Sequence, residues 1–212
     1  ASYTFDLEWA PTAPIEVPET AQIIEAGSIS AIIEPGASAV LDALAQGREH
    51  ALVFFDPNAR PSIMGEPAVA LVSLERFIAL ADVVKVSDED IEWLTGGVPI
   101  DKVVNRWLGM GPSLVVVTRG KHGSDVATAS GLRFTKTTSD VKVVDTVGAG
   151  DSFMGGMIDA MWGMGLRGAD ARETLRTLTE EQVRAIIDRA SAVSDVTVSR
   201  SGANPPWAHE LA

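Results

Sequence analysis

The residues whose types and spacing best suit chemistry lie between positions 145 and 156, where the chain reads Asp-Thr-Val-Gly-Ala-Gly-Asp-Ser-Phe-Met-Gly-Gly. We expect a strand at residues 141–144, a turn at the glycines and then a helix that continues to Trp162. The first backbone N–H groups of a helix lack partners within it, and the helix dipole places partial positive charge beside them. Small side chains let an anion approach that backbone closely. The glycine turn therefore predicts an anion site.

Asp151 stands in the first turn of the expected helix, next to this anion site. A carboxylate costs energy beside a bound phosphate, unless it takes a proton from the nucleophile that attacks the phosphate. The structural alternative is that Asp151 only favours the start of the helix, where acidic residues are common. The residue types alone leave both interpretations open.

Two other phosphate-binding motifs do not fit this stretch. A P-loop needs Lys-Ser or Lys-Thr after its last glycine, whereas Gly155 is followed by Gly156 and Met157. A dinucleotide-binding turn needs a glycine three places after Gly150, where Phe153 stands. The motif therefore belongs to neither class.

Apolar runs and helical patterns alternate along the rest of the chain. The runs expected as strands lie at residues 29–33, 51–55, 83–86 and 114–118, with a hairpin partner at 124–129. The helical patterns lie at residues 37–46, 69–80 and 100–108, with one or two more helices between 172 and 192. Ser87 is the expected N-cap of a further helix. This alternation is typical of an α/β fold with a mainly parallel sheet.

The N-terminal residues differ from this pattern. Tyr3, Phe5, Leu7 and Trp9 alternate with polar residues, which predicts a strand within residues 1–10. Residues 11–20 are spaced by prolines and form the expected connector, because proline excludes a helix interior or a central strand. Residues 21–212 form the expected α/β core. No signal peptide and no membrane span is expected.

Composition and charge narrow the function further. The 212 residues are 46% hydrophobic and 22% charged, as in ordinary folded proteins. The 29 acidic residues outnumber 17 lysines and arginines, which gives a net charge of −12. Such a chain repels nucleic acids and anionic membranes, so we expect neither as a partner. Cysteine is absent, which excludes disulfides and fits a cytoplasmic location.

The stretch from Asp145 to Asp151, Asp-Thr-Val-Gly-Ala-Gly-Asp, resembles the signature of the ribokinase-like sugar kinases, the PfkB family. The resemblance covers nearly the whole chain and is strongest to the fructokinase branch. It implies an α/β fold with a mainly parallel sheet, helices on both faces and part of a β lid at residues 1–10. Further matching segments are Glu34-Pro35-Gly36, Asp56-Pro57-Asn58-Ala59-Arg60, Lys85-Val86-Ser87-Asp88-Glu89-Asp90, Val117-Thr118-Arg119-Gly120 and Arg200-Ser201-Gly202-Ala203.

The resemblance implies an ATP-dependent kinase that phosphorylates a primary hydroxyl of a sugar, with fructose as the first expectation. Asp151 matches the catalytic base, and the backbone of Gly148, Ala149 and Gly150 matches the anion hole that takes up charge on the γ-phosphoryl group. A 2-keto-3-deoxygluconate kinase, a nucleoside kinase and a truncated non-catalytic nucleotide-binding module remain alternatives.

The resemblance also assigns ligand contacts. Those expected for the sugar are Glu34, Asn58, Arg60 and Asp151. Those expected for the nucleotide are Lys85, Ser87, Thr118, Gly120, Lys121, Gly123, Ala190 and Ser194.

Two cation sites are implied in the same way. Ser87 and Asp90 occupy the magnesium motif, which is Asn-x-x-Glu in ribokinases, so Asp90 is expected to act on Mg²⁺ through water. The alternative is that both residues only form a capping box. Many relatives bind a monovalent cation such as K⁺, and the matching positions are Asp145 and the carbonyls of Val147, Thr197, Arg200 and Gly202.

The family's N-terminal third, with a Gly-Gly sugar-binding segment and part of the lid, has no counterpart in this sequence. We therefore expect the 212-residue chain alone to bind nucleotide weakly and to phosphorylate sugar poorly. The lid also suggests a homodimer.

Overall fold

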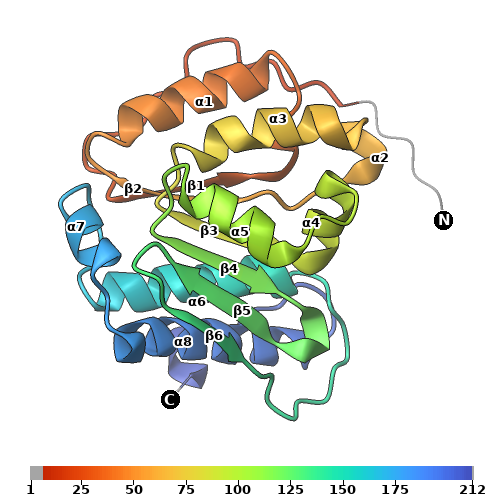
Figure 1. Ribbon diagram of the computed structural model, residues 1–212, viewed down its shortest axis with the longest axis vertical. Helices are drawn as coiled ribbons and strands as arrows, with labels where there is room; N and C mark the ends of the chain where they lie inside the picture. Colours follow the sequence, from red (N-terminus) through yellow and green to blue (C-terminus); the bar gives the residue numbers. More distant parts are fainter. Residues whose placement is uncertain (1–6, 212) are drawn as a thin grey trace.

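A six-stranded sheet forms the centre of the molecule in the computed structural model, which describes residues 7–211 (Figure 1). Its strands follow one another in chain order, and the first four, β1 to β4, run parallel. β5 pairs antiparallel with β4, and β6 pairs antiparallel with β5, so these three strands form a meander. The strands are β1 (Ile23–Gly27), β2 (Leu52–Asp56), β3 (Val83–Ser87), β4 (Leu114–Thr118), β5 (Ser124–Thr128) and β6 (Arg133–Lys136).

Helices cover both faces of this sheet, as expected (Figure 1). One face carries α1 (Gly36–Gly47), the short α2 (Pro61–Met64), α3 (Pro67–Ile78), α4 (Asp88–Thr95) and α5 (Ile100–Leu108). The other carries α6 (Ala149–Gly163), α7 (Ala171–Arg176) and α8 (Glu180–Val198). Three 3₁₀ turns, Ser28–Ala31, Gly120–His122 and Ala208–Glu210, complete the described elements.

The strands are apolar on both sides because each side faces a helical layer. In β2, Val53 and Phe55 belong to the core under α1 and α3, whereas Leu52 and Phe54 belong to the core under α6 and α8. The same alternation directs Lys85 of β3 toward the α6 layer, because its neighbours Val84 and Val86 pack on the opposite side.

α6 is fixed to the sheet and to α8 by close packing. A Cβ on Gly156 would come within 2.7 Å of the Cα of Ala190, so the two helices approach at a position that only glycine permits. Met157 and Met161 are fully buried beneath α6. This packing holds the first turn of α6 at the carboxyl ends of the parallel strands, the edge where open α/β sheets bind ligands.

Two expectations about the strands were wrong. The first strand is Ile23–Gly27 rather than residues 29–33, whose Ile29 and Ile32 pack on the core from a 3₁₀ turn and the loop after it. Residues 141–144 form no strand, because they do not join the sheet and their valines 143 and 144 are more than half exposed. In addition, the sequence did not predict β6.

The expected lid strand lies mostly outside the described residues, since these begin at Leu7. Residues 7–10 form no strand, and the carbonyl of Trp9 accepts the N–H of Gly36. Residues 11–20 contain no helix or strand. The division into lid, connector and core, and the homodimer through the lid, stay predictions.

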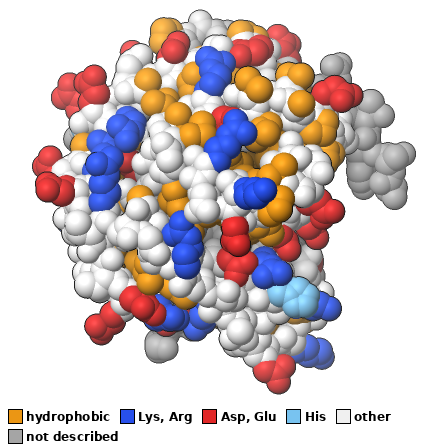
Figure 2. Space-filling view, viewed as in Figure 1, with side chains coloured by type: hydrophobic (Ala, Val, Ile, Leu, Met, Phe, Trp, Pro, Cys, Tyr) orange, Lys and Arg blue, Asp and Glu red, His pale blue; other side chains and the backbone are white. Residues whose placement is uncertain are grey.

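The described surface mixes charges of both signs. On the face drawn in Figure 2, lysines and arginines are interspersed with acidic and apolar side chains. None of the helices in the described part of the chain combines the length and the apolar character needed to cross a membrane.

Candidate active site at the start of α6

The first turn of α6 is open to solvent and is built on a left-handed glycine. Gly148 has φ 77° and precedes the helix, and no side chain caps the turn. Among the described residues, no hydrogen bond uses the N–H groups of Gly150 and Asp151. Such donors, together with the helix dipole, are the features on which the predicted anion site depends.

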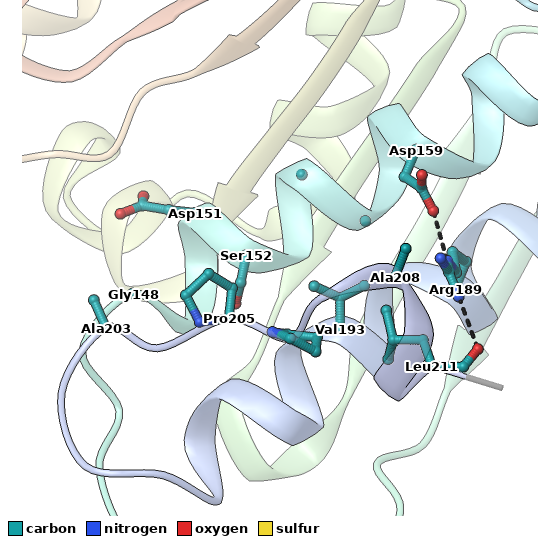
Figure 3. Close-up of a pocket in the computed structure, with 13 residues that line it drawn as sticks. Gly148, Asp151, Ser152, Asp159, Arg189, Val193, Ala203, Pro205, Ala208 and Leu211 are labelled. Carbon is teal, nitrogen blue, oxygen red and sulfur yellow. Dashed lines mark hydrogen bonds and ion pairs between the residues drawn. The ribbon is translucent and has the colours of Figure 1, made fainter.

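The side chain of Asp151 is exposed and borders two cavities. One, of about 580 Å³, lies between the carboxyl ends of β1 and β2 and the outer face of α6; Glu25, Ser28, Asn58 and Met154 also line it. The other, of about 530 Å³, lies between α6, α8 and the C-terminal segment (Figure 3). Asp151 is therefore placed to reach a ligand rather than to fill the core.

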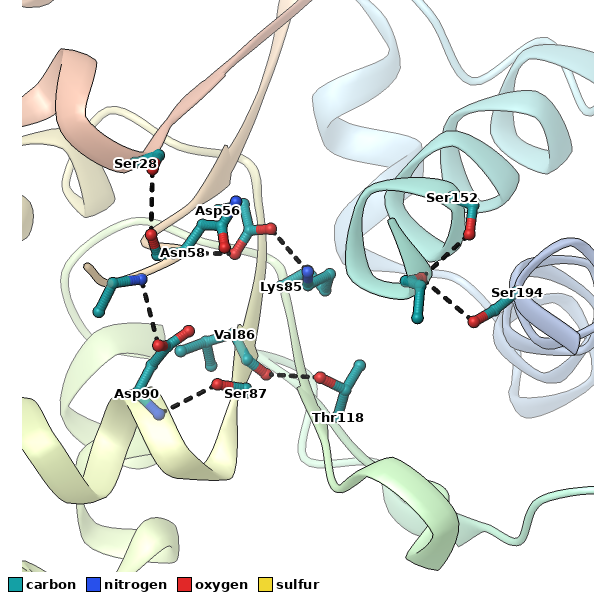
Figure 4. A network of polar contacts seen from close by, with 12 residues as sticks. Ser28, Asp56, Asn58, Lys85, Val86, Ser87, Asp90, Thr118, Ser152 and Ser194 are labelled. Carbon is teal, nitrogen blue, oxygen red and sulfur yellow. Dashed lines mark hydrogen bonds and ion pairs between the residues drawn. The ribbon is translucent and has the colours of Figure 1, made fainter. Parts of the chain in front are cut away.

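A buried ion pair supports the turn from below. Nζ of Lys85 lies 2.6 Å from Oδ2 of Asp56, and both residues are only 4% exposed (Figure 4). A Cβ on Gly150 would come within 2.8 Å of that Nζ, so the ammonium group lies directly against the turn. Burial raises the pKa of Asp56, and the neighbouring Lys85 ammonium offsets part of this effect.

Glu25 faces the larger cavity from β1. Its pKa is raised, first by burial and then by repulsion from Asp56 and Asp151, while Lys85 partly opposes the rise. Sequence reasoning missed this residue, because it placed the first strand after position 28. A lone glutamate inside the apolar run from Ile23 to Gly27 was the available signal.

The loop after β2 places Asn58 at the cavity, whereas the Arg60 side chain bonds residues of the same loop. Asn58 has φ 38°, its N–H bonds Oδ1 of Asp56, and its carbonyl accepts the hydroxyl of Ser28. The Arg60 guanidinium donates to Oδ1 of Asn58 at 2.7 Å and to the carbonyls of Asn58 and Ala59. Asn58 lines the cavity and Arg60 does not.

Ser87 and Asp90 form the start of α4. The hydroxyl of Ser87 accepts the N–H of Asp90 at 3.0 Å, which confirms Ser87 as N-cap. Oδ1 of Asp90 accepts the N–H of Ala59 at 3.1 Å, and within residues 7–211 its Oδ2 has no hydrogen-bond partner. No cluster of three potential metal ligands exists among the residues described. A single carboxylate oxygen fits Mg²⁺ bound largely through water and phosphate.

The other residues expected to contact the nucleotide lie at the end of β4. Thr118 pairs with Ser87 across the sheet, and Lys121 is exposed in the 3₁₀ turn that follows. Gly120 and Gly123 have φ 49° and 90°. A Cβ on Gly123 would come within 1.9 Å of the carbonyl oxygen of Lys136, so this tight turn requires glycine.

The loop before α6 is tied to the end of α8. The Asp145 carboxylate accepts the N–H groups of Val147 at 3.0 Å and Gly202 at 2.9 Å, and these bonds lower its pKa. The carbonyl of Thr197 accepts the N–H of Arg200. Asp145, Val147 and Gly202 are thus in direct contact, and Thr197 and Arg200 lie at the end of α8 that leads to Gly202. Carboxylate and carbonyl oxygens are suitable ligands for a hard cation.

Three further candidate residues make contacts within the protein. Glu34 bonds the N–H and hydroxyl of Ser38 at the start of α1 and does not line the cavity beside Asp151. Ala190 is fully buried against Gly156, so its expected contact with the nucleotide is corrected to a packing role. The hydroxyl of Ser194 donates to the carbonyl of Ala149, as does that of Ser152, which sequence reasoning missed (Figure 4).

A mainly parallel α/β sheet, an uncapped helix start at its carboxyl edge and an acidic residue beside that start form the arrangement expected of a phosphoryl-transfer site. The family model for the pfkB family of carbohydrate kinases matches residues 3–210. The chain therefore belongs to the pfkB carbohydrate kinase family.

Individual relatives within this family are fructokinases. The chain is 32% identical over 194 residues to the Arabidopsis thaliana protein named Probable fructokinase-2. It also matches a fructokinase double mutant from Vibrio cholerae O395, solved with fructose, ADP and a potassium ion, with 28% identity and a TM-score of 0.74. A Xylella fastidiosa fructokinase with bound ATP matches with 27% identity and a TM-score of 0.77.

These matches cover most of this chain but little more than half of each relative. The Arabidopsis alignment spans 90% of the chain and 56% of the relative. The Vibrio match covers 89% of this chain and 58% of that one, and the Xylella match covers 87% and 57%. What the relatives bind and phosphorylate is therefore a matter for proposal here.

Proposed function

We propose that this chain carries the nucleotide site and the catalytic base of an ATP-dependent sugar kinase that phosphorylates a primary hydroxyl, with fructose as the sugar. One observation carries the proposal: Asp151 is exposed at the uncapped start of α6, where two N–H groups are free and a cavity opens beside it. The similarity to fructokinases solved with fructose, ADP and ATP supports this choice of substrates.

In the proposed reaction, the Asp151 carboxylate accepts the proton of the sugar hydroxyl as the hydroxyl oxygen attacks the γ-phosphorus. The bond between the γ-phosphorus and the β–γ bridging oxygen breaks, and ADP leaves. The backbone of Gly148, Ala149 and Gly150 would surround the place where negative charge grows, with the N–H groups of Gly150 and Asp151 as the donors not used within the described structure, and Lys85 adds a positive charge beneath them. The Asp56 carboxylate keeps that ammonium group in position.

The nucleotide would reach this turn across the ends of β3 and β4. Ser87, Thr118 and Lys121 lie along that edge, and Gly120 and Gly123 shape the turn around it. Ser194 supports the site from α8 through its bond to Ala149. The sugar would occupy the larger cavity, against Asn58 and Asp151. Glu34 and Arg60 would contact the sugar only after a rearrangement, because neither lines this cavity and each bonds residues close to it in sequence.

Two cations fit the site as part of this proposal. Asp90 would hold Mg²⁺ through water, and the ion would neutralise phosphate charge. Asp145 and the neighbouring carbonyls would hold K⁺ next to the anion site. A potassium ion is present in the related Vibrio structure.

A non-catalytic nucleotide-binding module is the competing interpretation. It gains nothing from an exposed carboxylate beside a phosphate, because the two negative charges repel each other. The position of Asp151 therefore favours the kinase.

The kinase proposal predicts that Asp151→Asn abolishes phosphoryl transfer and leaves the affinity for ATP within a few-fold. The reason is that asparagine cannot accept the proton, while the N–H groups that bind phosphate are unchanged. Transfer of radiolabelled γ-phosphate to fructose, which detects slow turnover, and a calorimetric titration with ATP measure the two quantities.

Asp101→Asn is the matched control, since Asp101 is also an exposed first-turn aspartate, in α5, and is remote from the site. It should keep wild-type turnover. Full activity of Asp151→Asn would refute the assigned base, and ATP binding without transfer to any sugar in the wild type would favour the non-catalytic module.

A further inference from the structure

The charged residues that line the larger cavity beside Asp151 are all negative. Its ionisable lining residues are Glu25, Asp56 and Asp151, all acidic, and its neutral polar ones include Ser28 and Asn58. The nearby basic groups are engaged elsewhere: Lys85 pairs with Asp56, and Arg60 donates to its own loop.

Of the three acidic residues, only Glu25 has neither an ion-pair partner within the described structure nor a part in the proposed reaction. Asp56 holds Lys85, and Asp151 is the proposed base. Within the described part of the chain, no hydrogen bond and no ion pair engages the Glu25 carboxyl group. Its exposed side chain extends from β1 toward the α6 layer, because Ile24 and Ala26 pack on the opposite face. An acceptor group with no protein partner is thus presented to whatever fills the cavity.

We infer that Glu25 is a specificity-determining residue, which makes the site select uncharged polyhydroxylated acceptors over acceptors that carry a carboxylate or a phosphate. The inference rests on the proposed function and narrows its substrate class. It argues against a sugar acid such as 2-keto-3-deoxygluconate.

The chemistry of the two kinds of acceptor explains the selection. A sugar hydroxyl can donate a hydrogen bond to the Glu25 carboxylate, and hydrogen bonds to charged groups in proteins are stronger than neutral ones. An anionic acceptor brings a second negative charge into a cavity with no free cation among its described lining residues. Like charges placed together at a binding surface oppose binding strongly.

The test compares fructose with gluconate, a sugar acid of similar size, by calorimetric titration of the wild-type protein and of Glu25→Gln. Phosphoryl transfer is measured in the same samples. The wild type should bind fructose at least about tenfold more tightly than gluconate, and Glu25→Gln should reduce that preference by about tenfold or more, the worth of one charged hydrogen bond.

Equal affinity for the two ligands in the wild type, absence of binding to both, or an unchanged preference in Glu25→Gln would each overturn the inference. These results are independent of turnover. A protein that shows the expected preference and transfers no phosphate would contradict the kinase proposal while it supports the role of Glu25. A protein that phosphorylates fructose but binds fructose and gluconate equally well would support the kinase proposal and contradict the role of Glu25.

Two further variants keep the test decisive. Glu25→Asp retains the charge and shortens the side chain, so it should still reject gluconate and should bind fructose more weakly; loss of the rejection would count against the inference even if Glu25→Gln did not fold. Glu49→Gln removes an exposed glutamate outside the cavity and should leave the preference unchanged.

Discussion

At the level of single residues, the site depends on one cation among several carboxylates. Lys85 is buried with Asp56, close to both Gly150 and Glu25. Removal of either partner of a buried ion pair leaves the other charge uncompensated, which is strongly destabilising. Each partner therefore requires the other, and the pair places a positive charge under the proposed anion site.

The raised pKa of Glu25 has a consequence for stability. Burial and repulsion from Asp56 and Asp151 favour the protonated form in the folded state, although Lys85 opposes this. The ionised carboxylate therefore destabilises the fold at neutral pH, and this penalty disappears as the pH falls below the ordinary pKa of glutamate, about 4.3.

Glu25→Gln should accordingly raise the free energy of unfolding at pH 7, and the gain should shrink toward zero as the pH approaches 4. Urea denaturation of both proteins across this range measures the difference. A gain that grows at low pH would mean that the folded state lowers the pKa of Glu25 instead.

Sequence reasoning located the parts of the site that depend on local backbone rules. The glycine turn, the first-turn position of Asp151 and the Ser87 N-cap follow from helix-start chemistry, and the structure places all three as expected. Glu25, the Lys85–Asp56 pair and the inward packing of Ala190 depend on which strands and helices lie side by side. Such contacts between distant segments are not visible in residue spacing.

At the level of elements, the conformation of one residue determines how α6 begins. Gly148 has a left-handed backbone with φ 77°, and a Cβ there would come within 2.9 Å of the Cβ of Ala203. The start of the helix therefore requires glycine for two reasons, backbone strain and contact with the C-terminal segment.

Gly148→Ala should lower the free energy of unfolding by about 1–2 kcal/mol, the usual cost of a left-handed conformation for a residue with a Cβ. Gly163→Ala, at the exposed end of the same helix with free space around it, should leave stability unchanged or raise it by up to about 1 kcal/mol. Urea denaturation distinguishes the two. Equal stability of both variants would show that the turn tolerates a side chain.

The elements also show why some strands were predicted and others were not. The apolar runs at β2 and β4 are buried on both faces, and their sequences are continuous enough to identify. β1 carries Glu25 at the cavity, which interrupts its pattern, and β6 is a half-exposed edge strand with alternating burial. Residues 141–144 have strand-like composition and no strand to pair with, so composition alone was misleading there.

At the level of the whole molecule, the fold gathers residues from widely separated segments at one edge of the sheet. Asn58 follows β2, Asp90 follows β3, Lys121 follows β4 and Asp151 begins α6. Parallel strands with crossover helices place all their carboxyl ends on the same side, so this edge is where residues from different segments can act together. The fold class could be predicted from the alternation of elements, because that alternation itself implies a parallel sheet.

The kinase proposal depends on where the phosphoryl group lies relative to α6, which a crystal structure of the protein with fructose, Mg²⁺ and a non-hydrolysable ATP analogue would show. We expect the γ-phosphate within hydrogen-bond distance of the N–H groups of Gly150 and Asp151, with the Asp151 carboxylate directed at a primary hydroxyl of the sugar. A γ-phosphate bound away from this turn, or an Asp151 side chain that contacts neither ligand, would contradict it.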